Sequence, residues 1–236
     1  MNKRAFTLAE VLITLGIIGI VAAMTLPAVI AKYQKVQLKS QLNKSYSVMQ
    51  NALQKMQADT GVTPNAQNFS RQKFKEEYIK NFNVLLDCGL GSTDVTDKEN
   101  AQEYCVNEQT NHDEGDRRYT KHYKTYNKKT QIDNTLLNNG QFVLSDGTLI
   151  LIENWDTGNL YISADVNGIK NSPNIWGQDL FTFQLMDDGK LMPMGMPGTD
   201  YQPEQFCSKT SSHTYNGVAC TYWALTDDSF WNVLTR

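Results

Sequence analysis

The chain has 236 residues, a formal net charge of −3 and hydrophobic residues at 40% of its positions. This mild acidity argues against a nucleic-acid-binding protein, which would need clustered lysine and arginine. About 175 residues follow an apolar N-terminal segment, enough for one domain with its own core.

The N-terminal segment starts with the basic pentapeptide MNKRA and continues as FTLAEVLITLGIIGIVAAMTLPAVIA. Residues 11–31 carry no charged side chain, and at about 1.5 Å per residue they can form a membrane-spanning helix. Glu10 lies at the edge of this run. A carboxylate in hydrocarbon is costly unless it finds a partner, so Glu10 is a candidate functional residue. Pro27 interrupts the helical hydrogen bonds.

Two other interpretations of this segment are possible. A secretory signal peptide would use MNKR as its basic region and residues 29–31 as its cleavage site, but Glu10 and the length of the apolar run count against it. A single-pass anchor for an unrelated outer domain is the second interpretation. Neither accounts for Glu10, the string FTLAE and Pro27 together.

The string KRAFTLAEVLITLGIIGIVAAMTLP closely resembles the N-terminal cleavage and methylation segment of type IV pilins and type II secretion pseudopilins. The resemblance implies cleavage between Ala5 and Phe6, with Phe6 becoming the N-methylated terminus. Glu10 matches the family glutamate, and Pro27 matches the proline that kinks the helix. The family usually has glycine before the cut, where this chain has Ala5.

For the whole chain, the resemblance implies an α+β fold in which a long N-terminal helix packs on an antiparallel β-sheet head. We expect a leader peptide at 1–5, a transmembrane and filament-core helix at 6–31, an amphipathic helix at 32–59 and a globular pilin-like head at 60–236. The implied partners are a prepilin peptidase and N-methyltransferase, other pilin or pseudopilin subunits and an inner-membrane assembly platform. The implied location is the cytoplasmic membrane with the head outside the cytoplasm, then a periplasmic or extracellular filament.

Periodicity predicts the elements of the head. A one-sided apolar stripe favours a helix that packs on the sheet and stops at Gly61 (Leu38, Leu42, Tyr46, Met49, Leu53 and Met56). Ser70 is expected to cap a second helix whose apolar face carries Phe74, Tyr78 and Phe82. Hairpins are predicted at residues 141–153 and 180–192, each with an Asp-Gly turn, and a strand at 160–166. The aromatic tail from Tyr222 to Trp231 is expected to cover the sheet edge or core.

Residues 88–131 are polar with little periodicity, so a variable surface loop is expected there. Its basic and aromatic stretch at 117–129 could suit a single nucleic-acid strand. Acidic residues directly upstream favour a solvated loop of mixed charge instead, and nucleic-acid binding is therefore not expected.

Four cysteines in an exported domain predict two disulfides, because exported compartments are oxidising. Three pairings are possible. The pairing Cys88–Cys105 with Cys207–Cys220 is favoured because each bond closes a short local loop.

The stretch DVNGIKNSPNIWGQDLFTF, starting at Asp165, resembles a string found in the heads of many pilin-like proteins. Asn and Gly permit left-handed turns there, and Asp side chains bond local amides. Asp165, Asn167 and Asp179 could alternatively supply oxygen ligands to calcium. The string does not reproduce the ligand pattern of secretion pseudopilins or of an EF-hand, so a hydrogen-bonded turn is favoured.

No G-x-S-x-G elbow, Walker loop or H-E-x-x-H motif is present, and the three histidines lack zinc-like spacing. We therefore do not expect an enzyme. The favoured function is a structural subunit of a type IV pilus-like or type II secretion pseudopilus filament. The alternative is a membrane-anchored extracytoplasmic domain that binds a ligand, a surface or DNA and does not polymerise.

Overall fold

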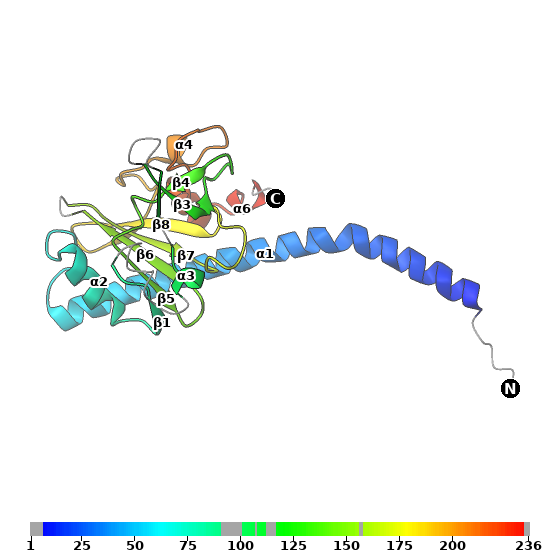
Figure 1. Ribbon diagram of the computed structural model, residues 1–236, viewed down its shortest axis with the longest axis horizontal. Helices are drawn as coiled ribbons and strands as arrows, with labels where there is room; N and C mark the ends of the chain where they lie inside the picture. Colours follow the sequence, from blue (N-terminus) through cyan, green and yellow to red (C-terminus); the bar gives the residue numbers. More distant parts are fainter. Residues whose placement is uncertain (1–6, 91–100, 107, 112–116, 156–157, 234–236) are drawn as a thin grey trace. The chain divides into compact units, whose positions relative to one another are not determined.

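The computed structural model describes residues 7–90, 101–106, 108–111, 117–155 and 158–233 (Figure 1). The first element is a single long helix, α1 (Leu8–Thr60), and a six-stranded antiparallel sheet follows it. The expected α+β fold, a long N-terminal helix with an antiparallel sheet, is confirmed. The chain divides into two compact units, residues 1–37 and residues 38–236.

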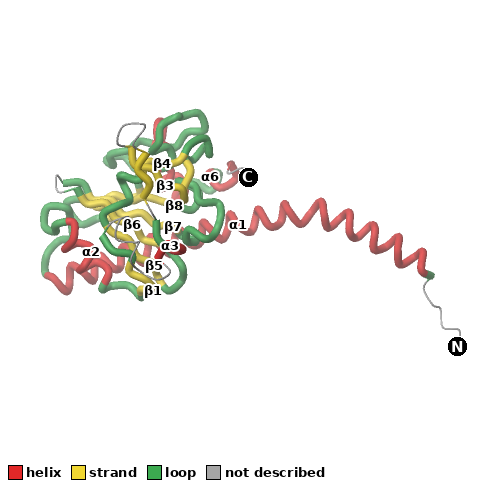
Figure 2. Tube along the Cα trace, viewed as in Figure 1, coloured by secondary structure: helices red, strands yellow, loops and turns green. Residues whose placement is uncertain are grey.

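The large sheet belongs to the second unit and follows the order β1-β5-β6-β7-β8-β9 (Figure 2). Both predicted Asp-Gly hairpins are present: Val143 pairs with Leu149 around the first turn, and Leu185 pairs with Leu191 around the second. Gly147 and Gly189 have φ values of +90° and +80°, which explains why glycine follows aspartate in both turns. The strands are β1 (Val84–Asp87), β5 (Gly140–Leu144), β6 (Leu149–Asn154), β7 (Leu160–Asp165), β8 (Leu180–Leu185) and β9 (Leu191–Pro193).

One face of the sheet packs on the part of α1 that lies in the second unit. The predicted stripe supplies the contact: Leu42, Met49, Leu53 and Met56 are buried in the core with apolar side chains of β5–β8. Tyr46 stacks on Phe183 and donates a hydrogen bond to the edge strand at the carbonyl of Leu191 (3.1 Å). The helix ends before Gly61, which has a φ of +70° and bonds back to the carbonyl of Gln57, as the sequence predicts.

The opposite face of the sheet is covered as well. As a result, the residues of β5 to β8 are buried whichever face of the sheet they point to. A second core forms there, in which Leu149 and Leu151 of β6 pack with Tyr123, Ile132 and Trp176. Tyr123 and Ile132 belong to a small sheet of order β2-β3-β4, made of β2 (Glu108–Asn111), β3 (Arg117–Lys124) and β4 (Gln131–Asp133).

This second sheet corrects one expectation. The stretch from 88 to 131 is not only a surface loop, because its described residues include β2, β3, the start of β4 and the short helix α3 (Ala101–Tyr104). The strands are polar, and the register between β3 and β4 shifts between its paired positions. A regular alternation of apolar and polar residues is therefore missing, although it is the pattern that would identify a strand.

The remaining helices close the head. Ser70 occupies the position before α2 (Arg71–Ile79) as predicted, but its side chain makes no capping bond, and Phe82 lies beyond the helix end while still contacting Tyr78 edge to face. The chain then forms α4 (Pro203–Phe206), the 3-10 helix η3 (Val218–Cys220), α5 (Thr221–Thr226) and α6 (Phe230–Val233).

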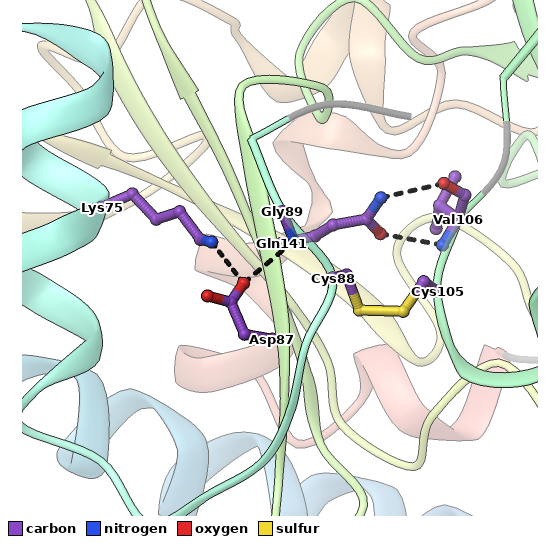
Figure 3. The surroundings of a disulfide bond; sticks show 7 residues. All are labelled: Lys75, Asp87, Cys88, Gly89, Cys105, Val106 and Gln141. Atoms are coloured by element: carbon purple, nitrogen blue, oxygen red, sulfur yellow. Dashed lines mark hydrogen bonds and ion pairs between the residues drawn. A yellow bond between two sulfur atoms is a disulfide. The ribbon is translucent and has the colours of Figure 1, made fainter. Parts of the chain in front are cut away.

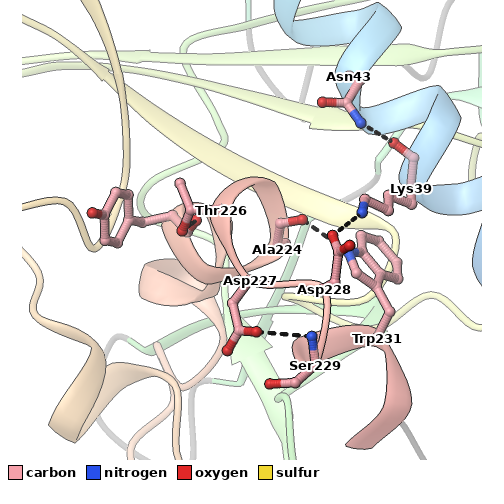
Figure 4. A network of polar contacts seen from close by, with 9 residues as sticks. Lys39, Asn43, Ala224, Thr226, Asp227, Asp228, Ser229 and Trp231 are labelled. Carbon is pink, nitrogen blue, oxygen red and sulfur yellow. Dashed lines mark hydrogen bonds and ion pairs between the residues drawn. The ribbon is translucent and has the colours of Figure 1, made fainter.

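The aromatic tail packs into the first core, as expected. Phe230 and Trp231 are buried, and the indole N–H of Trp231 donates to the carbonyl of Ala224 (2.8 Å). Figure 4 shows this segment beside the start of the second unit, where Lys39 of α1 forms an ion pair with Asp228.

Candidate functional site

The described part of the N-terminal segment begins with a reciprocal contact between Thr7 and Glu10. The amide and hydroxyl of Thr7 donate to Oε2 of Glu10 at 2.8 and 2.9 Å, and the amide of Glu10 donates to the Thr7 hydroxyl at 3.3 Å. This is a capping box, in which two side chains satisfy main-chain amides left open at a helix start. Thr7 therefore orients the carboxylate through Oε2. Among the described residues no donor reaches the other carboxylate oxygen, Oε1, so this oxygen can still accept from a cationic group.

The helix beyond Glu10 presents apolar side chains on every side. In the first unit its large apolar residues from Leu8 to Ile30 are exposed, and it is the one described helix long and apolar enough to cross a membrane. Its hydroxyls bond to its own main chain: Thr14 donates to the carbonyl of Glu10 and Thr25 to that of Val21, both at 2.9 Å. The segment can therefore enter hydrocarbon without leaving these hydroxyls unsatisfied.

Two features of this segment affect close packing. Gly16 and Gly19 have no neighbour within 4 Å of the position a Cβ would take, and at a spacing of three they lie on one face. Such small residues allow another helix to approach closely. Pro27 lies inside α1 and cannot donate a main-chain hydrogen bond, which weakens the helix at that point. The predicted cleavage residues, Ala5 and Phe6, lie outside the described residues.

The structure brings the three proposed calcium ligands into one loop, where hydrogen-bond donors contact the oxygens of both aspartates, whereas the side-chain oxygen of Asn167 is buried without a partner among the described residues. Oδ1 of Asp165 accepts from the amides of Asn167 and Gly168 (3.3 and 2.9 Å), and Oδ2 accepts from the hydroxyl of Tyr123 (2.5 Å). The two oxygens of Asp179 accept from the amides of Asn174 and Ile175 at 2.6 and 2.7 Å.

The electrostatics of this loop agree with the contacts. Burial raises the pKa of Asp165 to about 6. Burial, and secondarily the nearby charge of Asp165, raises the pKa of Asp179 well above its usual range. The described residues contain no group of three or more His, Cys, Asp or Glu side chains that could hold a metal ion. The oxygens of Asp165 and Asp179 already accept hydrogen bonds from within the fold, and these contacts favour the hydrogen-bonded turn over a calcium site.

The four cysteines pair as favoured from the sequence, Cys88 with Cys105 and Cys207 with Cys220. Three polar residues around the disulfides and Asp165 are not predicted from the sequence, namely Tyr123, Gln141 and Asn216. Nothing in the local sequence marks these positions, because their partners are 42, 35 and 8 residues away in the chain. Thr7 was also missed, although its spacing from Glu10 is that of a capping box.

Two aromatic rings of the basic stretch, those of Tyr123 and Tyr126, have described positions that bear on binding of a single strand. Base stacking needs exposed rings. Tyr123 is fully buried and Tyr126 is 9% exposed, so neither ring is available.

Together, the exposed apolar helix and the antiparallel sheet define an α+β protein whose N-terminal helix is consistent with membrane anchoring. Residues 1–26 match the family model described as the prokaryotic N-terminal methylation motif. The chain therefore carries the N-terminal signature of type IV pilins and pseudopilins, and the motif supports a pilin-like or pseudopilin precursor. No curated protein and no solved structure matches the chain.

Proposed function

We propose that this chain is a structural subunit of a type IV pilus-like or type II secretion pseudopilus filament and has no catalytic role of its own. The observation that carries the proposal is Glu10, an oriented carboxylate at the start of a long apolar helix within a matched methylation motif. The subunit waits in the cytoplasmic membrane, with Lys3 and Arg4 on the cytoplasmic side and the head outside.

Processing supplies a cationic partner for Glu10. A prepilin peptidase cuts between Ala5 and Phe6, and the new amine of Phe6 carries a positive charge before and after methylation. This amine pairs with Glu10 of a neighbouring subunit. Each charge is costly alone in apolar surroundings, so the two favour the one register in which they meet.

The rest of the segment allows the helices to pack into a filament core. The exposed apolar side chains lose contact with lipid and gain contact with other helices, and Gly16 and Gly19 permit close approach. Pro27 allows the helix to bend as it leaves the bilayer. Assembly requires other pilin or pseudopilin subunits and an inner-membrane platform.

A Glu10→Gln variant separates assembly from helix capping. Glutamine completes a capping box as glutamate does but carries no charge. We expect the variant to insert in the membrane and to keep its helix, yet to be absent from filaments sheared from cells. The readouts are immunoblots of membrane and filament fractions and electron microscopy.

Glu204→Gln is the matched control, because Glu204 is an exposed acid of the head. It should assemble as the unchanged protein does. If Glu10→Gln also assembles at that level, the charge of Glu10 does not set the register, and Glu10 is only a helix cap. If the unchanged protein and Glu204→Gln are both absent from filaments, the alternative of an anchored domain that does not polymerise becomes the better account.

A further inference from the structure

Both disulfides have the same unusual neighbour, a buried carboxamide side chain that pairs with the main chain next to one cysteine. Gln141 and Asn216 are 2% and 0% exposed. The side chain of each accepts a hydrogen bond from the main-chain amide of one residue and donates a second to the carbonyl of that same residue. That residue directly follows a cysteine in both cases: Val106 follows Cys105, and Ser208 follows Cys207.

Gln141 links the two sides of the first disulfide without using the sulfur atoms (Figure 3). Its side chain accepts from the amide of Val106 at 2.8 Å and donates to its carbonyl at 2.9 Å. Its own carbonyl accepts from the amide of Cys88, and its own amide donates to Gly89, both at 3.1 Å. One residue of β5 therefore fixes the main chain beside Cys88 and beside Cys105.

Asn216 and Gly217 fix the second disulfide in a similar way. Oδ1 of Asn216 accepts from the amide of Ser208 at 2.9 Å, and Nδ2 donates to its carbonyl at 2.8 Å. The amide of Gly217 donates to the carbonyl of Phe206 at 2.7 Å. The residues on both sides of Cys207 are thus held by two turn residues, Asn216 and Gly217, which are close in sequence to Cys220.

The position of Gly217 depends on its lack of a side chain. Its φ is +126°, and a Cβ there would meet the carbonyl oxygen of Trp176 at 2.4 Å. Such an approach is open only to glycine. Two hydrogen bonds from one carboxamide to the amide and carbonyl of one residue fix both the position and the direction of that main-chain segment. Leaving buried main-chain groups unpaired destabilises the fold.

We propose that Gln141 and Asn216 are positioning residues that hold each cysteine pair within bonding range before oxidation, so that each disulfide forms on an already closed loop. In this reaction each pair of thiols loses two protons and two electrons as the S–S bond forms. A disulfide such as oxidised glutathione takes up both and becomes two thiols. The inference does not depend on filament assembly.

The test measures the effective concentration of each cysteine pair in the full chain, held in detergent micelles and equilibrated with reduced and oxidised glutathione. The reduced and disulfide-bonded fractions of each cysteine pair are measured by alkylation and peptide mass spectrometry. We expect Gln141→Met to lower the value for Cys88–Cys105 by about thirtyfold, the equivalent of two hydrogen bonds or about 2 kcal/mol, and to leave Cys207–Cys220 unchanged. Asn216→Leu should do the reverse.

Each variant is the control for the other pair. If neither value changes, or if both pairs weaken equally in both variants, the positioning role is wrong. A second measurement uses the unchanged protein, in case a variant does not fold. After reduction, the amides of Val106 and Ser208 should remain protected from hydrogen exchange, within about tenfold of the oxidised protein. Exchange at the rate of an unstructured peptide would overturn the proposal.

Discussion

Asp165 and Asp179 are buried carboxyl groups that interact with each other and have no lysine or arginine partner among the described residues. A buried carboxylate without a cation is costly, so both pKa values rise. An acid whose pKa is higher in the folded than in the unfolded state binds an extra proton on folding. Its contribution to stability is complete below the unfolded pKa and is lost as pH rises through the folded pKa.

The Asp165→Asn variant tests this consequence. Asparagine keeps the oxygen that accepts from Asn167 and Gly168, and its amide can donate to the hydroxyl of Tyr123. Because it is neutral at every pH, we expect it to match the unchanged protein near pH 4. At pH 8 it should be more stable by on the order of 2–3 kcal/mol, since the pKa of Asp165 is about 6.

Urea unfolding between pH 4 and pH 8 measures this difference, with the exposed Asp59→Asn as the control. Calcium and a calcium chelator should both leave the curves unchanged. If the difference in stability between Asp165→Asn and the unchanged protein is the same at pH 8 as at pH 4, the ionised form of Asp165 carries no cost in the folded state.

Lys75 is another ionisable residue that is buried. Its side chain is 6% exposed and pairs with Asp87, which is 47% exposed and also accepts from the amide of Gly89 (2.9 Å). Removing one partner of a buried pair leaves an uncompensated charge, whereas replacing the buried partner with an apolar side chain removes the cost as well. We expect Asp87→Ala to destabilise the head by about 1–3 kcal/mol and Lys75→Met to cost less.

The double variant is the decisive comparison in that series. Lys75→Met should restore most of the stability lost in Asp87→Ala, as measured by urea unfolding. If the two losses simply add, the ammonium of Lys75 is not the source of the cost.

At the scale of elements, the second-unit part of α1 is held by its apolar face. Met49 is fully buried in the first core, and its carbonyl accepts from the hydroxyl of Tyr78 in α2 (3.2 Å). We expect Met49→Ala to lower the free energy of unfolding by about 2–5 kcal/mol because it leaves a cavity. Gln54→Ala, on the exposed face of the same helix, should change it by less than about 0.5 kcal/mol.

Equal effects in these two variants would mean that the helix is not held by this face. Urea unfolding followed by the fluorescence of the buried Trp176 and Trp231 reports the difference.

The elements that the sequence predicts well are those with a local signal. The Asp-Gly turns fix both hairpins, and the apolar stripe from Leu38 to Met56 identifies the buried face of α1. The small sheet lacked such a signal, because its polar strands are stabilised by packing against β6 and by contacts such as that of Tyr123 with Asp165.

The candidate site divides in the same way. Glu10 and Pro27 stand out because a charge and a proline are rare in an apolar run. The roles of Gln141 and Asn216 could not be predicted, since their partners are 35 and 8 residues away and a polar side chain is usually exposed.

At the scale of the whole molecule, the second unit contains both cores, both sheets and both disulfides. A chain of residues 38–236 should therefore fold as a soluble monomer. We expect the same β-sheet content by circular dichroism and no free thiol on alkylation. An aggregated or unfolded product would mean that residues 1–37 are required for the fold.

The central claim is that removal of the leader creates an amine that pairs with Glu10. Intact and peptide mass spectrometry of the protein isolated from its native membrane tests this claim most directly. The account predicts a mature chain that begins with N-methylated Phe6. A chain that retains Met1 to Ala5, or one that begins at Lys32, would contradict it.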